Sequence, residues 1–309
     1  MRVSLQALLR RAFFDMEGSQ ELLFKSHSHV SSGRKLLKPS DDPVGMYISM
    51  CLENGIDAET QYIRNIDDGT AWTNFTDGVI DQLTEKLTRA KQLALQGSND
   101  TYTNEERRKI AIEINQILEH VYALSNTRYK EKYIFAGTNT LTQPFSATYD
   151  ATTGEILTVQ VNPTIPSPPG IDGKIYREVG ENERVQINIT GTELFTGPTV
   201  DIFQTLIDLR DALRNDDLTT MKNCIDQLDQ GLSQVLNARA KLGGIINRLQ
   251  LNKSRSEDKK LRLQGNKSEL QDADMAQELI NLQKAQIAYQ AALFATSRVI
   301  QYSLVKFVS

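Results

Sequence analysis

The sequence has few cysteines, histidines and aromatic residues. Its 309 residues include two cysteines and three histidines, and aromatic residues make up 7% of the chain. Cys51 and Cys224 lie far apart and form no C-x-x-C pair, so neither a disulfide framework nor a zinc site is predicted. His27 and His29 are two residues apart and point in different directions on a helix, which does not match a metal site. The sequence therefore predicts no bound metal and no cofactor.

Sequence signatures of catalysis are also missing. The chain contains no G-x-S-x-G turn, no Walker loop for phosphate and no H-E-x-x-H pair, so we predict that the protein is not an enzyme. Its formal net charge of -4 gives no general attraction to phosphate backbones, and nucleic acid is therefore not an expected partner. The basic stretch at 253–267 is interleaved with acidic residues, which is typical of a solvated helix face.

The sequence also lacks long apolar runs. No run approaches the roughly 18 to 20 residues that a membrane-spanning helix needs, so membrane insertion is not predicted. Arg10 and Arg11 interrupt the apolar start of the chain, and no small-x-small cleavage pattern follows them. A cleavable secretory signal peptide is therefore not expected. If the protein acts outside the cell, we expect an export route that requires neither a membrane-spanning helix nor a cleavable signal peptide.

Both ends of the chain carry the same helical pattern of apolar residues. These residues recur at alternating steps of four and three, which places one narrow stripe on one side of a helix, as in a coiled coil. Neither end can bury its stripe alone, so we expect the ends to pair with each other and then to pack against neighbouring subunits. The predicted assembly interface consists of Leu5, Leu9, Met16, Leu23, Val30, Leu279, Leu282, Tyr289, Leu293, Ile300 and Phe307.

Polar residues interrupt both stripes. Ser19, Ser26, Gln286, Thr296 and Ser303 occupy positions where leucine or isoleucine would stabilise the pairing most. A buried leucine contributes about 1.5 to 3 kcal/mol, whereas ordering a residue costs about 1 to 2 kcal/mol of backbone entropy. The two terms nearly cancel in such a pair of helices. We therefore predict that the terminal segments are largely disordered in the free monomer and fold on assembly.

Glycine and proline mark the first boundary between helices. The helix expected over about 4–32 ends at Gly33, because glycine tolerates the left-handed conformation that closes helices. Pro39 and Pro43 exclude a continuous helix through this stretch. Asp42 is a suitable N-cap for a new helix with Pro43 in its first position. These four residues form the predicted helix-boundary motif.

Longer helices follow, and they flank a segment of different character. Four-three steps indicate a helix over 44–97, whereas 144–198 holds most of the prolines and short alternating runs that are typical of strands. The predicted fold is mainly α: an elongated antiparallel helical rod or coiled coil formed from both termini, with an inserted small β-rich module. The predicted domains are an N-terminal arm at 1–43, rod halves at 44–143 and 200–265, the β-rich module at 144–199 and a C-terminal arm at 266–309.

Several motifs, in order along the chain, resemble the bacterial flagellin superfamily. The matching stretches are S-S-G-R-K at 31–35, P-S-D-D-P at 39–43, Q-Y-I-R-N-I at 61–66, Y-I-F-A-G at 133–137, G-G-I-I-N-R-L at 243–249 and the tail at 272–304. P-S-D-D-P differs from the A-K-D-D-A that filament flagellins usually carry at this place. Within the superfamily, the sequence is therefore most similar to the junction proteins between hook and filament.

The resemblance implies a structural role in the bacterial flagellum. It implies terminal helices paired in an inner layer, a rod of middle helices and a β module that projects outward. It also implies export of an unfolded chain through the flagellar type III apparatus, with a cytoplasmic chaperone on the C-terminal segment. The implied partners are a hook-side junction protein, flagellin and further copies of the chain. Two alternatives stay open, namely the filament subunit itself and a secreted coiled-coil adhesin or effector.

Overall fold

The computed structural model describes residues 5–165, 170–197 and 199–308 of the chain, without the side chains of residues 5, 6, 8, 9 and 302–308. The chain forms two compact units. Unit 1 contains residues 1–58 and 258–309, and unit 2 contains residues 59–257. Two long helices contribute to both units, α2 over Pro43–Gly97 and α6 over Leu218–Gln271. The predicted mainly α fold with a small β-rich insert is confirmed.

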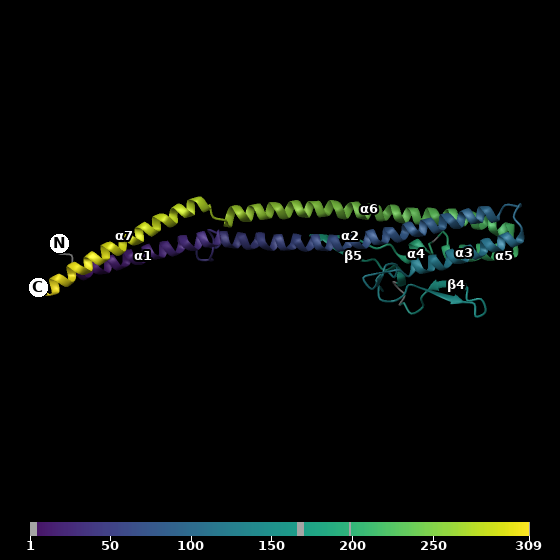
Figure 1. The fold of residues 1–309 in the computed structure, drawn as a ribbon, viewed down its shortest axis with the longest axis horizontal. Coiled ribbons are helices and arrows are strands. Elements are labelled where there is room, and N and C mark those ends of the chain that lie inside the picture. Colours follow the sequence, from purple (N-terminus) through teal and green to yellow (C-terminus); the bar gives the residue numbers. More distant parts are fainter. Residues whose placement is uncertain (1–4, 166–169, 198, 309) are drawn as a thin grey trace. The chain divides into compact units, whose positions relative to one another are not determined.

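Unit 1 pairs the two ends of the chain. Helix α1 (Leu5–Ser32) and helix α7 (Met275–Val308) lie side by side and run in opposite directions, as Figure 1 shows. The predicted pairing of the terminal helices is therefore confirmed. Among the described residues of the whole chain, we find no helix with both the length and the hydropathy that crossing a membrane would require.

The break between the first two helices lies at the residues of the helix-boundary motif. Helix α1 ends at Ser32, and Gly33 follows with a left-handed φ of 69°. Pro39 lies in a turn that Asp41 closes by donating its N–H to the Lys38 carbonyl. Helix α2 begins at Pro43, and the side chain of Asp42 accepts hydrogen bonds from the next two free backbone N–H groups. Local chemistry alone accounts for this break between helices.

Unit 2 contains the main hydrophobic core. Its part of α2 packs with α3 (Asn104–Ser125), α5 (Ile202–Asn215) and its part of α6. The side chains of Leu83, Ile114, Leu118, Leu206 and Leu242 are fully buried there. Thr103 and Glu106 form a capping box that starts α3, and Asp201 caps α5. A large apolar core of this kind stabilises unit 2 without help from a partner.

The β-rich insert consists of three antiparallel pairs of strands in the described part of the chain. These pairs are β1 (Arg128–Tyr129) with β2 (Lys132–Tyr133), β3 (Phe145–Tyr149) with β4 (Ile156–Val161), and β5 (Tyr176–Gly180) with β6 (Glu183–Gln186). A 3-10 turn over Gly170–Asp172 and the short helix α4 (Gly191–Leu194) complete the insert.

The insert shares the core of the helices. Phe145 of β3 and Phe195 after α4 pack against Phe203 of α5, with ring centroids 5.3 to 5.4 Å apart. Val159 and Val185 of the strands are buried in the same cluster as the helix residues. The resemblance implied a module that projects outward, and the structure adds that its apolar side chains also complete the core of unit 2.

Candidate assembly surface

The inner face of the α1–α7 pair carries part of the predicted interface. Met16, Leu23 and Val30 of α1 are half-buried, as are Leu282 and Tyr289 of α7. All five follow the four-three spacing that keeps a narrow stripe on one side of a helix. The structure thus places these predicted residues between the two arms. Little of their side-chain surface remains accessible to another subunit.

Polar contacts join the two helices along this face. The hydroxyl of Thr296 in α7 donates a hydrogen bond to the backbone carbonyl of Ala12 in α1 at 3.4 Å. His29 Nδ1 in α1 lies 3.5 Å from a carboxylate oxygen of Glu278 in α7. Ser26, His29 and Thr296 are buried, so the seam holds polar groups where a coiled coil would gain most from leucine.

The remaining predicted interface residues lie elsewhere. Leu279, Leu293 and Ile300 of α7 are exposed, with 53%, 42% and 37% of their surface accessible. Leu5, Leu9 and Phe307 lie in helices, and their side chains fall outside the described part of the structure. The spacing pattern in the sequence therefore combined residues that are half-buried in the single chain with residues on a similar side of α7 that remain more exposed.

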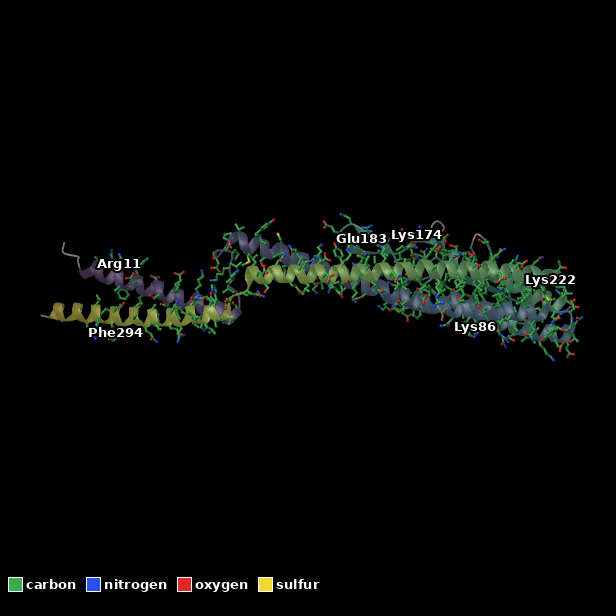
Figure 2. All side chains as sticks on the ribbon, turned by 90° about the horizontal axis from the view of Figure 1, so that it is seen from above. Arg11, Lys86, Lys174, Glu183, Lys222 and Phe294 are labelled. Atoms are coloured by element: carbon green, nitrogen blue, oxygen red, sulfur yellow. The ribbon has the colours of Figure 1, made fainter. Side chains whose placement is uncertain are left out.

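A second apolar stripe lies on the outer side of α7, and sequence reasoning missed it. Ile280, Ile287 and Phe294 are each seven residues apart and all exposed. The seven-residue interval aligns them on one side, about half a turn away from the buried Ala285 that faces α1. Figure 2 shows Phe294 on the side of α7 away from α1. The repeat of seven was the signal in the sequence that could have revealed this stripe.

The arms have almost no hydrophobic core of their own. Ala285 is the one fully buried apolar side chain among those described in α1 and α7. Large apolar side chains on both helices remain exposed instead, namely Phe13, Phe14, Leu22, Phe24, Met275, Leu279, Ile280, Ile287, Leu293, Phe294 and Ile300. Exposed apolar surface of this extent marks an interaction site. The arms are therefore suited to bury these side chains against other chains.

A backbone clip joins the two connecting segments at the base of the arms. The N–H of Lys35 donates to the Gln271 carbonyl at 2.8 Å, and the N–H of Ala273 donates to the Gly33 carbonyl at 2.9 Å. Arg34 and Asp272 form the antiparallel bridge between these bonds. The clip fixes the end of α1 beside the start of α7. The pairing of the arms therefore has a defined register at this end.

One carboxyl group in the first connecting segment has a shifted pKa. The pKa of Asp41 is lowered because the backbone N–H of Lys38 donates a hydrogen bond to its carboxylate. The ionised form of Asp41 thus helps to shape the turn around Pro39.

Among the described residues, no group of three or more His, Cys, Asp or Glu side chains could hold a metal ion.

Comparison with known families identifies two matching regions. The bacterial flagellin N-terminal helical region matches residues 10–140, and the bacterial flagellin C-terminal helical region matches residues 225–308. Together the two regions cover more than two thirds of the chain. They include α2, α3 and α7 and most of α1 and α6, and they leave out most of the β-rich insert.

Individual relatives include hook and filament proteins. The chain is 26% identical over 300 residues to flagellar hook-associated protein 3 of Escherichia coli strain K12, which covers 94% of this chain and 95% of that protein. It is 25% identical over 264 residues to the flagellar filament 30.7 kDa core protein of Treponema maltophilum, with 85% and 84% covered. A solved structure of flagellar hook associated protein-3 from Legionella pneumophila has a TM-score of 0.62 at 14% identity, covering 72% of this chain and 98% of the solved one. This last likeness shows a shared fold.

Proposed function

Because the chain belongs to the bacterial flagellin family, we propose that it is the structural protein that joins the hook to the flagellin filament, as the third hook-associated protein. The observation that carries this proposal is the alignment with the Escherichia coli hook-associated protein, which spans nearly all of both chains. The alignment with the Treponema filament protein covers less of each chain. The family consists of flagellar structural proteins, so the chain acts by assembly and is not an enzyme.

The physical mechanism is packing that repeats from subunit to subunit. One patch on a subunit contacts a different patch on the next, so that the contacts continue around and along a helical lattice. The lack of apolar core between α1 and α7 supports this mechanism, because no large apolar side chain described in these helices is fully buried within the single chain. Folding of the arms is thereby coupled to arrival at the growing structure.

The proposed assembly interface includes both the half-buried and the more exposed residues of the interface predicted from the sequence. Residues that face the partner helix, such as Leu23 and Leu282, align the two arms. Residues that stay more exposed in the single chain, such as Leu279, Leu293 and Ile300, contact neighbouring subunits. Leu5, Leu9 and Phe307 extend the interface toward the ends of the helices. The proposed domains are the arms at 1–43 and 266–309, rod halves at 44–143 and 200–265 and the module at 144–199.

The partners and the route to the flagellum follow from the same role. The chain contacts another junction protein on the hook side, flagellin on the filament side and further copies of itself. It reaches this extracellular position unfolded, through the flagellar type III apparatus. A cytoplasmic chaperone covers the C-terminal segment before export. The exposed apolar side chains of α7 support the need for such protection.

Immunogold labelling of intact flagella tests the proposal directly. Antibody against this chain should mark one short zone between hook and filament. Label along the whole filament would contradict the junction role and would favour the filament subunit. Label that is absent from flagella would overturn a flagellar role altogether. In that case, ligand binding by the β-rich insert would favour the adhesin or effector alternative.

A further inference from the structure

The start of α2 in unit 1 carries an exposed apolar stripe. Val44, Tyr47 and Cys51 follow each other at steps of three and four, which places them on one side of the helix. Val44 and Tyr47 are 68% and 70% exposed, and Cys51 is exposed as well. The opposite side of the same helix segment holds the buried residues Ser49 and Ile56. We call Val44, Tyr47 and Cys51 the α2 stripe.

The α2 stripe lies in an acidic stretch. Residues 41–59 contain five acidic residues and no lysine or arginine. Glu53 contacts Lys267 of α6 and Asp41 lies 3.9 Å from Lys25 of α1 in the same unit. Glu59 is buried, whereas Asp42 and Asp57 are exposed near the stripe. A partner that covers this surface should therefore combine apolar side chains with positive charge.

The outer stripe of α7 has this combination. Ile280, Ile287 and Phe294 are 47%, 63% and 64% exposed. Lys284 and Arg298 follow Ile280 and Phe294 by four residues each, so they flank the stripe, and Arg298 lies 5.0 Å from the centre of the Phe294 ring. The one acidic residue of α7, Glu278, is held on the other side of the helix by His29 of α1. The outer side of α7 is thus apolar and cationic.

The α2 stripe also has the spacing of the first half of the α7 stripe. Val44 and Cys51 are seven residues apart, as are Ile280 and Ile287, and seven residues of a helix span about 10.5 Å. We propose that the outer stripe of α7 in one copy of the chain docks on the α2 stripe of a second copy. The two stripes are different surfaces of one chain, so each added copy presents a new free stripe and the contact repeats. This inference deepens the proposed function and rests on it.

Disulfide cross-linking with the natural Cys51 tests the contact. The variant Ile287→Cys places a second exposed thiol in the centre of the α7 stripe, while Cys224 is buried and does not take part. A disulfide needs Cα atoms within about 7 Å. Mild oxidation of flagella isolated from cells that carry the variant should give a ladder of dimers, trimers and larger species on a non-reducing gel. Every copy carries both thiols, so a repeating contact links many copies.

The matched control is Ala288→Cys, which adds an exposed thiol one residue along the same helix and about 100° around it. This control should remain monomeric, and so should Ile287→Cys combined with Cys51→Ser. Monomers alone from incorporated Ile287→Cys would overturn the inference. A ladder of equal strength from Ala288→Cys would also overturn it. Immunogold labelling of the same flagella tests the proposed junction role separately. Failure of the docking contact can therefore be distinguished from failure of the proposed function.

A charge-reversal variant tests the same contact if Ile287→Cys is not incorporated into flagella. Lys284→Glu together with Arg298→Glu should lower the amount of protein in isolated flagella by about tenfold, which corresponds to about 1.4 kcal/mol. Adding Asp57→Lys to the same chain should restore at least half of the loss. Unchanged incorporation of the double variant, or no restoration by Asp57→Lys, would overturn the inference.

Discussion

The double variant Leu282→Asp with Leu293→Asp separates assembly from the stability of unit 2. Leu282 is half-buried against α1, and Leu293 remains 42% exposed in the single chain. Both side chains become buried in the assembled flagellum if our mechanism is correct. Because the arms are predicted to order only on assembly, the reference state is the unfolded arm. Full burial of a leucine from that state contributes about 1.5 to 3 kcal/mol, so two such losses weaken assembly by roughly 3 to 6 kcal/mol. Two buried carboxylates add a further desolvation cost.

These magnitudes predict loss of function without loss of the main core. A change of about 1.4 kcal/mol is tenfold in affinity, so incorporation should fall by at least about a hundredfold and motility should be lost. The two side chains belong to unit 1, so unfolding of unit 2 in urea should change by no more than about 0.5 kcal/mol. The assays are motility in soft agar, the amount of protein in isolated flagella, and circular dichroism of the purified chain.

A matched control distinguishes position from added charge. Ala288→Asp with Ala295→Asp introduces the same two charges into α7 at exposed positions seven residues apart. This control should retain most of the incorporation. Normal motility of the Leu282→Asp, Leu293→Asp variant would refute the assignment of these residues to assembly. Equal loss in both variants would show that charge alone, and not the apolar stripe, determines the result.

Three further predictions concern unit 2 and the thiols. Leu83 is fully buried in the core, so Leu83→Ala should lower the free energy of unfolding of unit 2 by about 2 to 5 kcal/mol in urea titrations, and a change below 1 kcal/mol would contradict the core assignment. Burial raises the pKa of the Cys224 thiol to about 11, so iodoacetamide at pH 8 should label Cys51 in the native chain and Cys224 only after unfolding, as mass spectrometry would detect. The pKa of Glu155 is lowered because Arg214 donates hydrogen bonds to its carboxylate at 2.6 Å, so this pair stabilises the fold above the ordinary glutamate pKa and stops doing so as pH falls through the lowered pKa. Glu155→Gln should therefore destabilise unit 2 at neutral pH and make little difference in strong acid, and a constant difference at all pH values would contradict the role of this ion pair.

The sequence predicted features that depend on neighbouring residues. Gly33 closes α1 and Asp42 starts α2, because a left-handed glycine and an N-cap act within one turn of a helix. The β-rich insert was also visible from its prolines and alternating runs. In each case the physical cause lies within a few residues, so a single sequence was sufficient to locate it.

Features that depend on distant contacts could not be predicted in the same way. Helix α7 has apolar residues on two sides, and the four-three pattern did not show that Leu282 is half-buried while Leu293 remains more exposed. The sequence likewise did not show that Phe145 of the insert packs on Phe203 of α5. Such contacts join segments that are far apart in the chain, and periodicity within one segment does not indicate its partner.

Amide hydrogen exchange compares the arms in the free chain and in the assembled flagellum. Our account predicts fast exchange over residues 10–30 and 278–300 of the purified chain, because little apolar surface is buried between α1 and α7. The same residues should exchange at least about a hundredfold more slowly in isolated flagella, while the core helices of unit 2 stay protected in both samples. Strong protection of both arms in the free chain, with no gain on assembly, would contradict the claim that the arms become ordered by joining the polymer.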